Sequence, residues 1–228
     1  MDNQRAVPHF ALGVLTVLSL GAIVLSLHLA PANAGQQLTT AAKNTVSVGS
    51  FVLTDTVTAV NAKSAGGGTH HEVVDIVYRA PDQVREAVSA SGQTETLLAL
   101  GMSRYIRRGN GPWQALSPTD VNAPVGQQAA QGVLQPLVDL TPATSVVRHG
   151  DRYSFEPTAR SLILTELFGA SGASLPPSAS TFEATVSGEF LKEVDIRVHT
   201  PGGQVMVKFA LRSFDTAPAL VAPVQPGR

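Results

Sequence analysis

The residues best suited to metal binding are the consecutive side chains His70-His71-Glu72, with His149 and His199 elsewhere in the chain. Imidazole and carboxylate groups are ligands that zinc accepts. Neighbouring residues of a strand point to opposite faces, so the two adjacent histidines cannot both face one ion. No ligand spacing of a known metal motif accompanies them. We therefore interpret the tripeptide as the solvated start of a strand and expect no metal site and no cofactor.

The serine that most suggests nucleophilic catalysis is Ser171, within Gly169-Ala170-Ser171-Gly172-Ala173. This segment lacks the second glycine of a nucleophile elbow at the required position, and it lies in a loop rich in Gly, Ser and Pro. The carboxylates of Asp139, Asp151 and Glu156 are scattered, and scattered carboxylates are usually solvated charges. The absence of cysteine excludes a thiol nucleophile and a thiolate metal site. We expect no catalytic residue and no enzyme.

An apolar cavity is the other kind of site that the residue types allow, because ligand pockets are mostly apolar. The candidate lining residues are Tyr78, Leu98, Leu100, Met102, Tyr105, Trp113, Phe182, Phe190 and Phe209. A closed core explains the same residues equally well, because an acyl chain and a core side chain gain from burial in the same way. Residue type alone does not separate these two interpretations.

The overall composition narrows the class of protein. The chain has 228 residues, of which 43% are hydrophobic and 14% charged, and its formal net charge is -1. A nearly neutral chain without a basic cluster gives no footprint for a phosphate backbone, so we expect no nucleic-acid partner. The length that follows the N-terminal segment suits one domain with a core of its own.

The elements that must position such a site begin with a β-hairpin between Phe190 and Leu211. Apolar and polar residues alternate on both sides of Pro201-Gly202-Gly203, as in the run Val194, Asp195, Ile196. A period of two places successive side chains on opposite faces, and the glycines allow a tight reversal. The pattern predicts two antiparallel strands with one apolar face.

Several further strands are predicted before this hairpin, separated by turn signals. Their ranges are Thr45–Val60, His71–Tyr78, Gln83–Val88, Thr94–Leu100 and Met102–Arg107. The segment Val73–Tyr78 is apolar on both faces, which is unusual for a sheet with one face in water. We therefore expect helices to cover one face and further protein or a ligand to cover the other.

The second half of the chain is more mixed. Val125–Leu140 is a helix candidate with a break at Pro136, and Ser145–Phe155 is extended with a turn at Gly150-Asp151. Leu162–Phe168 is too short to assign by periodicity. The remaining expectations are a loop over Gly169–Ser180, a strand over Thr181–Val186 and an extended, uncovered tail from Ala217.

The N-terminal segment Phe10–Ala30 is almost wholly apolar and follows Arg5. About 20 apolar residues cross a bilayer, whereas the apolar core of a signal peptide is usually about 7 to 15 residues. Ala32 and Ala34, however, offer the small residues that a signal peptidase reads. Residues 1–34 are thus a membrane anchor or a cleaved signal peptide. In both cases the working domain is extracytoplasmic, in the cell envelope, membrane-anchored or secreted into the periplasm or medium.

The order of parts resembles the bacterial LolA-type lipid and lipoprotein carriers, and among them the actinobacterial LppX/LprG envelope lipoproteins. The segments that carry the resemblance are Val77–Arg85, Leu100–Arg107 followed by Gly111-Pro112-Trp113, and Phe209–Pro218. The resemblance implies an α+β fold, a curved antiparallel half-barrel covering helices, with an apolar cavity for acyl chains. One departure is the absence of a lipobox cysteine, which excludes anchoring by a cysteine-linked lipid.

The sequence therefore predicts a tether or a short first helix over 35–45, a half-barrel domain over 46–223 and a short tail over 224–228. Its expected partner is a lipid or an acylated molecule, bound without catalysis by a carrier or binding domain. The segment 10–30 makes the membrane a second partner if it is not cleaved. The alternative is a membrane-anchored sensor or scaffold whose sheet recognises another envelope protein, since one fold hosts many functions.

Overall fold

The computed structural model describes residues 33–60, 68–117, 134–135, 137–168, 175–200 and 202–223. The chain divides into two units, Met1–Asn33 and Ala34–Arg228, and every described helix and strand belongs to the second. The expected anchor or signal segment, the serine loop Gly169–Ala173 and most of the helix candidate Val125–Leu140 lie outside the described residues. None of the helices in the described part of the chain has the length and apolar character that a bilayer crossing requires.

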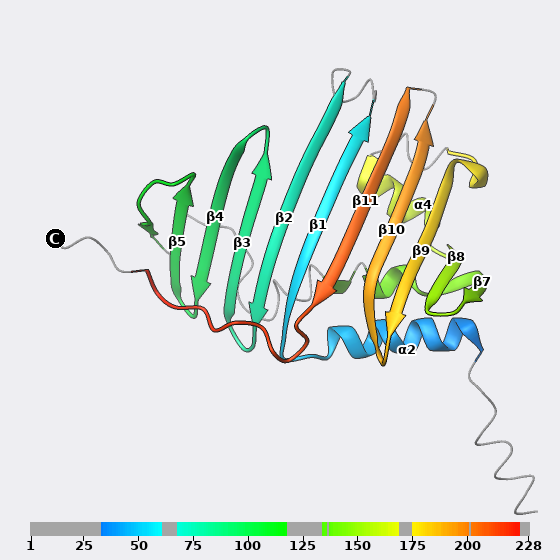
Figure 1. Ribbon diagram of the computed structural model, residues 1–228, viewed down its shortest axis with the longest axis horizontal. Helices are drawn as coiled ribbons and strands as arrows, with labels where there is room; N and C mark the ends of the chain where they lie inside the picture. The colour runs from blue at the N-terminus through cyan, green and yellow to red at the C-terminus, as the bar shows by residue number, and fades with distance from the viewer. Residues whose placement is uncertain are drawn as a thin grey trace, which may run out of the picture. The chain divides into compact units, whose positions relative to one another are not determined.

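Eleven strands of the described residues form one antiparallel sheet (Figure 1). The strands are β1 Ser50–Val60, β2 Thr69–Arg79, β3 Gln83–Ala90, β4 Gln93–Leu100, β5 Ser103–Arg108, β6 Gln114–Leu116, β7 Ala143–His149, β8 Arg152–Pro157, β9 Ser180–Ser187, β10 Phe190–Thr200 and β11 Gly203–Arg212. Their spatial order is β6-β5-β4-β3-β2-β1-β11-β10-β9-β8-β7. The sheet is therefore two meanders joined where the first strand pairs with the last.

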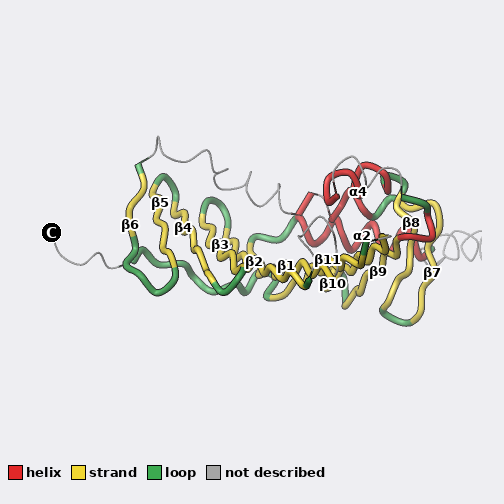
Figure 2. The backbone as a smooth tube through the Cα atoms, turned by 90° about the horizontal axis from the view of Figure 1, so that it is seen from above, coloured by secondary structure: helices red, strands yellow, loops and turns green. Residues whose placement is uncertain are grey.

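The described helices lie on one face of this sheet, over the half formed by β7 to β11 (Figure 2). They are α2 Ala34–Val46, α4 Arg160–Phe168 and the short 3-10 helix η2 Pro177–Ala179, with further helical turns at 134–135 and 137–140. Figure 2 also shows the sheet curving toward the helix side at both ends. The expected curved antiparallel sheet covering helices is confirmed.

The core forms where the helices meet the sheet. Strand β10 buries Val194, Ile196 and Val198 against it, while Arg197 between them is exposed. The buried side chains that the helical segments contribute include Leu38 of α2, Leu164 of α4 and Leu137. The predicted hairpin is confirmed, with Ile196 opposite Val207 and an apolar face that packs under helices.

Helix α2 decides between two expectations for the segment 35–45, which was predicted as a tether or a short first helix. The segment is helical and buries Leu38, Ala41, Ala42 and Thr45. The predicted strand Thr45–Val60 accordingly begins only at Ser50. β-Branched residues favour strands only weakly, and tertiary packing overrides that preference. Here the Thr45 hydroxyl donates to the Ala41 carbonyl inside the helix, at 2.8 Å.

The C-terminal tail is the clearest correction. It was expected to be uncovered from Ala217, yet the Ala217 side chain is buried against Val52 and Val77. Its backbone N–H donates to the Ser50 hydroxyl and its carbonyl accepts from the Arg79 guanidinium, both at 3.2 Å. The tail therefore covers Val77 on the sheet face away from the helices, which explains why the Val73–Tyr78 segment is apolar on both faces.

Two further segments complete the comparison. The apolar run that periodicity left unassigned, Leu162–Phe168, lies within helix α4. The predicted strand and turn of Ser145–Phe155 are observed as β7 and β8 around Gly150.

A candidate apolar binding pocket

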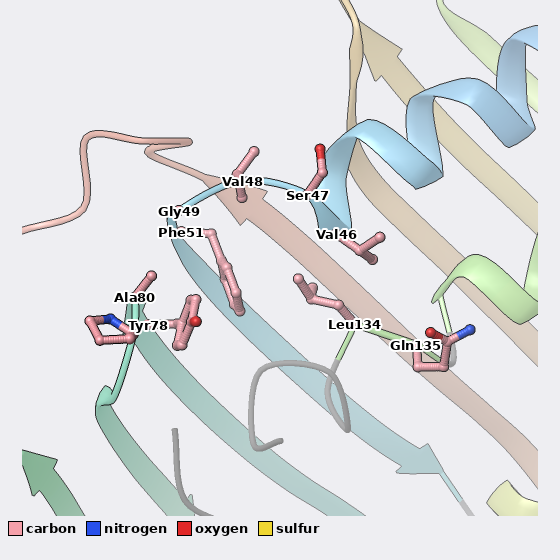
Figure 3. Close-up of a pocket in the computed structure, with 10 residues that line it drawn as sticks. Val46, Ser47, Val48, Gly49, Phe51, Tyr78, Ala80, Leu134 and Gln135 are labelled. Carbon is pink, nitrogen blue, oxygen red and sulfur yellow. The ribbon is translucent and has the colours of Figure 1, made fainter. Parts of the chain in front are cut away.

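A pocket of about 380 Å³ opens where α2 ends, β1 begins and β2 ends (Figure 3). The lining residues are Val46, Ser47, Val48, Gly49, Phe51, Tyr78, Ala80, Pro81, Leu134 and Gln135. Ligand pockets in proteins commonly range from about 300 to 1,000 Å³, so this volume suits a small apolar group or part of a chain. The pocket is thus a joint product of one helix end, two strand ends and the segment at 134–135.

An aromatic pair forms one wall of the pocket. Phe51 of β1 lies directly opposite Tyr78 of β2, with ring centroids 5.3 Å apart and ring planes tilted by 36°. Cross-strand aromatic pairs stabilise an antiparallel sheet and prefer such offset or tilted geometry. Figure 3 shows both rings and the side chain of Leu134 directed into the same space.

The rim of the pocket is fixed by hydrogen bonds of the α2–β1 connection. After α2 ends at Val46, the Ser47 hydroxyl donates to the Asn44 carbonyl at 2.8 Å. The Gly49 N–H donates to the Asp215 carboxylate at 2.7 Å, and the Gly49 carbonyl accepts the Ala80 N–H at 2.7 Å. These contacts tie the α2–β1 connection to the end of β2, so the opening does not depend on free side chains.

The lining suits binding rather than reaction. It contains no charged side chain, and its two hydroxyl groups belong to Ser47 and Tyr78. Ser47 is already engaged with the end of α2. Burial, and to a lesser degree the charge of Asp82, raises the pKa of the Tyr78 hydroxyl above its ordinary range. That hydroxyl therefore stays protonated at neutral pH and can donate one hydrogen bond to a ligand.

The structure divides the predicted lining residues between the two faces of the sheet. Strand register pairs Tyr78 with Val84 and Val84 with Ala99, which places these three on the helix side. Leu98, next to Ala99, lies on the opposite face together with its cross-strand partner Tyr105. The predicted candidates on the helix side are Tyr78, Phe182 and Phe209, and those on the opposite face are Leu98, Leu100 and Tyr105.

The last three candidates lie outside both groups. Met102 occupies the β4–β5 turn and is 81% exposed. Trp113 follows β5, with the Arg107 guanidinium 4.8 Å from its ring centroid. Phe190 stacks on Phe214 with centroids 4.6 Å apart. Of the nine predicted residues, only Tyr78 lines the pocket described above.

Phe51, Val46, Val48 and Leu134 line the pocket without having been singled out from the sequence. Phe51 lies within the predicted strand Thr45–Val60, so its apolar type was known from the sequence, but its spatial neighbours were not. The contribution of Val46 depends on where α2 ends, and residues near a helix end are the hardest to place by pattern.

A second feature of the helix-side face is the carboxyl group of Asp55. It lies on β1 opposite Val74 of β2 and Phe209 of β11, and its Oδ1 is buried without a hydrogen-bond partner among the described residues. Burial, with a smaller contribution from the charge of Glu72, raises the pKa of Asp55 to about 6. The face that carries the core therefore also carries a carboxyl group that is only partly ionised near pH 6.

The histidines are dispersed. His70 and Glu72 share a face, with Nε2 and Oε2 3.7 Å apart, whereas His71 contacts the Thr58 hydroxyl on the other face at 3.1 Å. Within the described ranges, no three His, Asp or Glu side chains lie close enough together to hold a metal ion.

No family model matches the sequence, and no curated protein matches it either. Among solved structures, the lipoprotein LppX of Mycobacterium tuberculosis shares 14% identity, over 84% of this chain and 100% of LppX, with a TM-score of 0.47. A LolA superfamily protein from Nitrosomonas europaea shares 10% identity, over 82% and 94% of the two chains, with a TM-score of 0.33. A DUF1329 family protein from Desulfovibrio piger shares 10%, over 83% and 95%, with a TM-score of 0.31.

Proposed function

We propose that this protein binds a lipid or another acylated molecule in its apolar pocket and carries or presents it without catalysis. The observation that best supports this proposal is the pocket itself, which has no charged side chain in its lining, includes the apolar side chains of Val46, Phe51 and Leu134, and opens between the ends of α2 and β2. Burial of an acyl chain gains roughly 0.8 kcal/mol for each methylene group removed from water. The Tyr78 hydroxyl supplies a hydrogen-bond donor for a polar group at one end of the ligand.

The proposed place of action is outside the cytoplasm, with the domain held at the membrane by residues 10–30. This segment has 21 residues and is nearly free of charge, which matches the length needed to cross a bilayer. Arg5 precedes it, and positive residues favour the cytoplasmic side. Sequencing the N-terminus of the mature protein tests this part, because cleavage after Ala34 would remove the anchor.

Native mass spectrometry of the full chain, extracted in a mild detergent, tests the binding proposal. The matched variants are Ala80→Phe, which places a ring at the pocket mouth, and Ala115→Phe on the exposed strand β6. The Ala80 backbone N–H still donates to Gly49 in the first variant, so we expect it to fold. Lipids that surround the anchor remain in both variants, which makes the difference between them diagnostic.

We expect wild type and Ala115→Phe to retain a bound lipid that Ala80→Phe loses. Equal lipid in all three proteins would show that the retained molecules do not occupy the pocket. A wild-type mass without lipid, after extraction from a lipid-containing host, would overturn the proposal.

A sensor or scaffold role is the second candidate, and strand β7 favours it. Ala143–His149 pairs with β8 along one edge only, and no described strand pairs with its other edge. Val147 on this strand is 53% exposed. An open edge accepts an extended segment of another protein by strand addition. Crosslinking from position 147 to one specific envelope protein would support this role.

A further inference from the structure

Three of the large exposed hydrophobic side chains belong to segments at the end of the sheet that holds the pocket mouth. Five large hydrophobic side chains are exposed among the described residues: Val46, Met102, Val147, Leu162 and Val221. Val46 lines the pocket, and Met102 and Val221 belong to segments at the same end of the strands, as the next contacts show. Apolar side chains that cluster at the surface mark interaction sites, whereas isolated ones need no explanation.

Met102 projects from a turn that is held on both sides. The Gly101 N–H donates to the carbonyl of Asp82 in the β2–β3 turn at 3.1 Å, which joins this turn to the residues beside the pocket mouth. The buried Arg104 side chain donates to the Gly101 carbonyl at 2.7 Å. Gly101 has a φ of +58°, and an added Cβ would lie 3.2 Å from the Asp82 carboxylate. The methionine is therefore displayed on a fixed turn although it is 81% exposed.

The tail also lies at this end, where Leu220, the residue before Val221, packs against the cluster of Val52, Val77 and Ala217. The contacts of Ala217 with Ser50 and Arg79 fix the tail at the start of β1 and the end of β2. From there the tail, red in Figure 1, runs along the ends of β2 to β5 where the Met102 turn lies. The pocket mouth, the methionine turn and the tail thus share one edge of the domain.

Helix α2 lies along this edge as well. Its Asn44 side chain donates to the Glu189 carbonyl in the β9–β10 turn at 3.2 Å, and its Thr45 hydroxyl accepts the Leu191 N–H at 2.9 Å. Figure 1 shows the helix crossing the ends of β9 and β10. Under the proposed anchor, the three residues between Ala30 and the start of α2 reach at most about 14 Å. A retained anchor would therefore limit how far the start of α2 can lie from the bilayer.

We propose that this edge, formed by Val46, Met102, Val221 and the pocket mouth, docks on the lipid bilayer so that the pocket opens toward the acyl chains. The inference rests on the proposed binding function and on the retained anchor. It names a lipid surface as the partner, because a retained anchor would hold the start of α2 within a short reach of a bilayer and a fixed apolar side chain suits insertion at the interface. The segments at this edge carry both signs of charge, with Lys43 in α2, Arg79 and Asp82 around the β2–β3 turn, and Asp215 in the tail. Docking should accordingly occur on neutral phosphatidylcholine, without anionic lipid.

Tryptophan quenching in the full chain, reconstituted in phosphatidylcholine vesicles, tests the docking surface. Met102 precedes the six-residue strand β5 and the native Trp113 follows it, so the two side chains lie at opposite ends of that strand. The native indole is first removed by Trp113→Phe. In that background Met102→Trp reports on the edge, and Leu162→Trp is the matched control on α4, at a position that is 67% exposed. Lipids brominated on their acyl chains then quench only an indole that enters the bilayer.

We expect the fluorescence of M102W to shift to shorter wavelength and to lose about half its intensity with brominated lipid, as for a side chain buried roughly 5–10 Å into the interface. The fluorescence of L162W should stay unchanged. Equal, weak quenching of both variants would overturn the docking surface. A photo-crosslinker in place of Met102 that captures one protein and no lipid would also overturn it, in favour of a protein contact.

The outcomes separate the two proposals. Retained lipid in native mass spectrometry together with an unquenched M102W would remove the docking surface and leave the binding function intact. A quenched M102W in a chain that carries no lipid would remove the binding function and leave a membrane-facing edge.

Discussion

The Thr45 hydroxyl joins helix α2 to the sheet by accepting the backbone N–H of Leu191 at 2.9 Å. Both residues are buried, and the same hydroxyl donates to the Ala41 carbonyl. Leu191 follows the first residue of β10. One side chain therefore satisfies a strand N–H that would otherwise be buried without a partner, and it fixes the helix beside the pocket.

Replacing Thr45 by valine should destabilise the domain by about 1–3 kcal/mol, the usual cost of leaving a buried donor unsatisfied. Thr45→Ser keeps the hydroxyl and should lose much less. Urea unfolding of the two variants measures the difference. Equal stability of valine and serine variants would show that the Leu191 N–H finds another partner.

The Asp55 carboxyl should make the domain less stable as the pH rises. Its pKa is raised from an ordinary 3.8 to about 6, so folding favours the protonated form. The stability that this group contributes is present below about pH 4 and is lost as the pH rises through 6. Allowing for solvent screening of a part-exposed carboxyl, the loss at neutral pH is roughly 1 kcal/mol.

Urea unfolding of Asp55→Asn and wild type at pH 4 and pH 7 checks this sign. From pH 4 to pH 7, the free energy of unfolding of Asp55→Asn should rise by about 1 kcal/mol relative to that of wild type. Asp75→Asn serves as a control, because Asp75 accepts the Thr54 hydroxyl on the opposite face and leaves Asp55 in place. A constant difference between Asp55→Asn and wild type would contradict the assignment.

Charge at position 209 should depend on Asp55, because Phe209 lies directly opposite it across β1 and β11. Both Phe209→Asp and Phe209→Lys lose core packing, but only the first places two carboxyl groups face to face. At pH 7 we expect the lysine variant to be more stable by about 1 kcal/mol, the upper range of a cross-strand charge effect.

The matched control repeats both substitutions in the Asp55→Asn background, where their difference should shrink. Phe209→Leu gives the reference for an apolar side chain of smaller volume. If the difference between aspartate and lysine persists without Asp55, another charge determines it.

The tail should stabilise the domain through Ala217. Ala217→Asp buries a carboxyl group against Val52 and Val77, and we expect a loss of about 2 kcal/mol or more. Val221 lies four residues further along the tail and is exposed, so Val221→Asp should change stability by less than about 0.5 kcal/mol. Urea unfolding compares the two. Similar small effects of both substitutions would mean that the tail leaves the sheet in solution.

The antiparallel strands and the final hairpin followed from the sequence because alternation is local. In a run such as Val194, Asp195 and Ile196, successive side chains point to alternate faces, so neighbours in the chain define the pattern. The turn glycines mark where the chain reverses. Helix α2 was not predicted as part of the core, because its β-branched C-terminal residues resemble a strand. The contact that favours the helix at Thr45 is the hydrogen bond from the Leu191 N–H, which is distant in the sequence.

The pocket could not be read from the sequence for a different reason. A strand has two faces, and only its register with neighbouring strands decides which of their residues share a face with a given side chain. Leu98 and Tyr78 are similar in apolar character, yet the pairing through Val84 and Ala99 places them on opposite sides. Phe51, in contrast, became a wall of the pocket because β1 pairs with β2 at that residue.

The sequence by itself determined an antiparallel sheet with an apolar face, a chain without cysteine and an apolar segment before the domain. These are properties of composition and of neighbouring residues. Only the three-dimensional packing shows that the tail covers Val77, that α2 packs against β10 and that Phe51, Tyr78 and Leu134 surround one space. Those contacts join residues that are far apart in the chain, so the energy of burying them together is not written in any single segment.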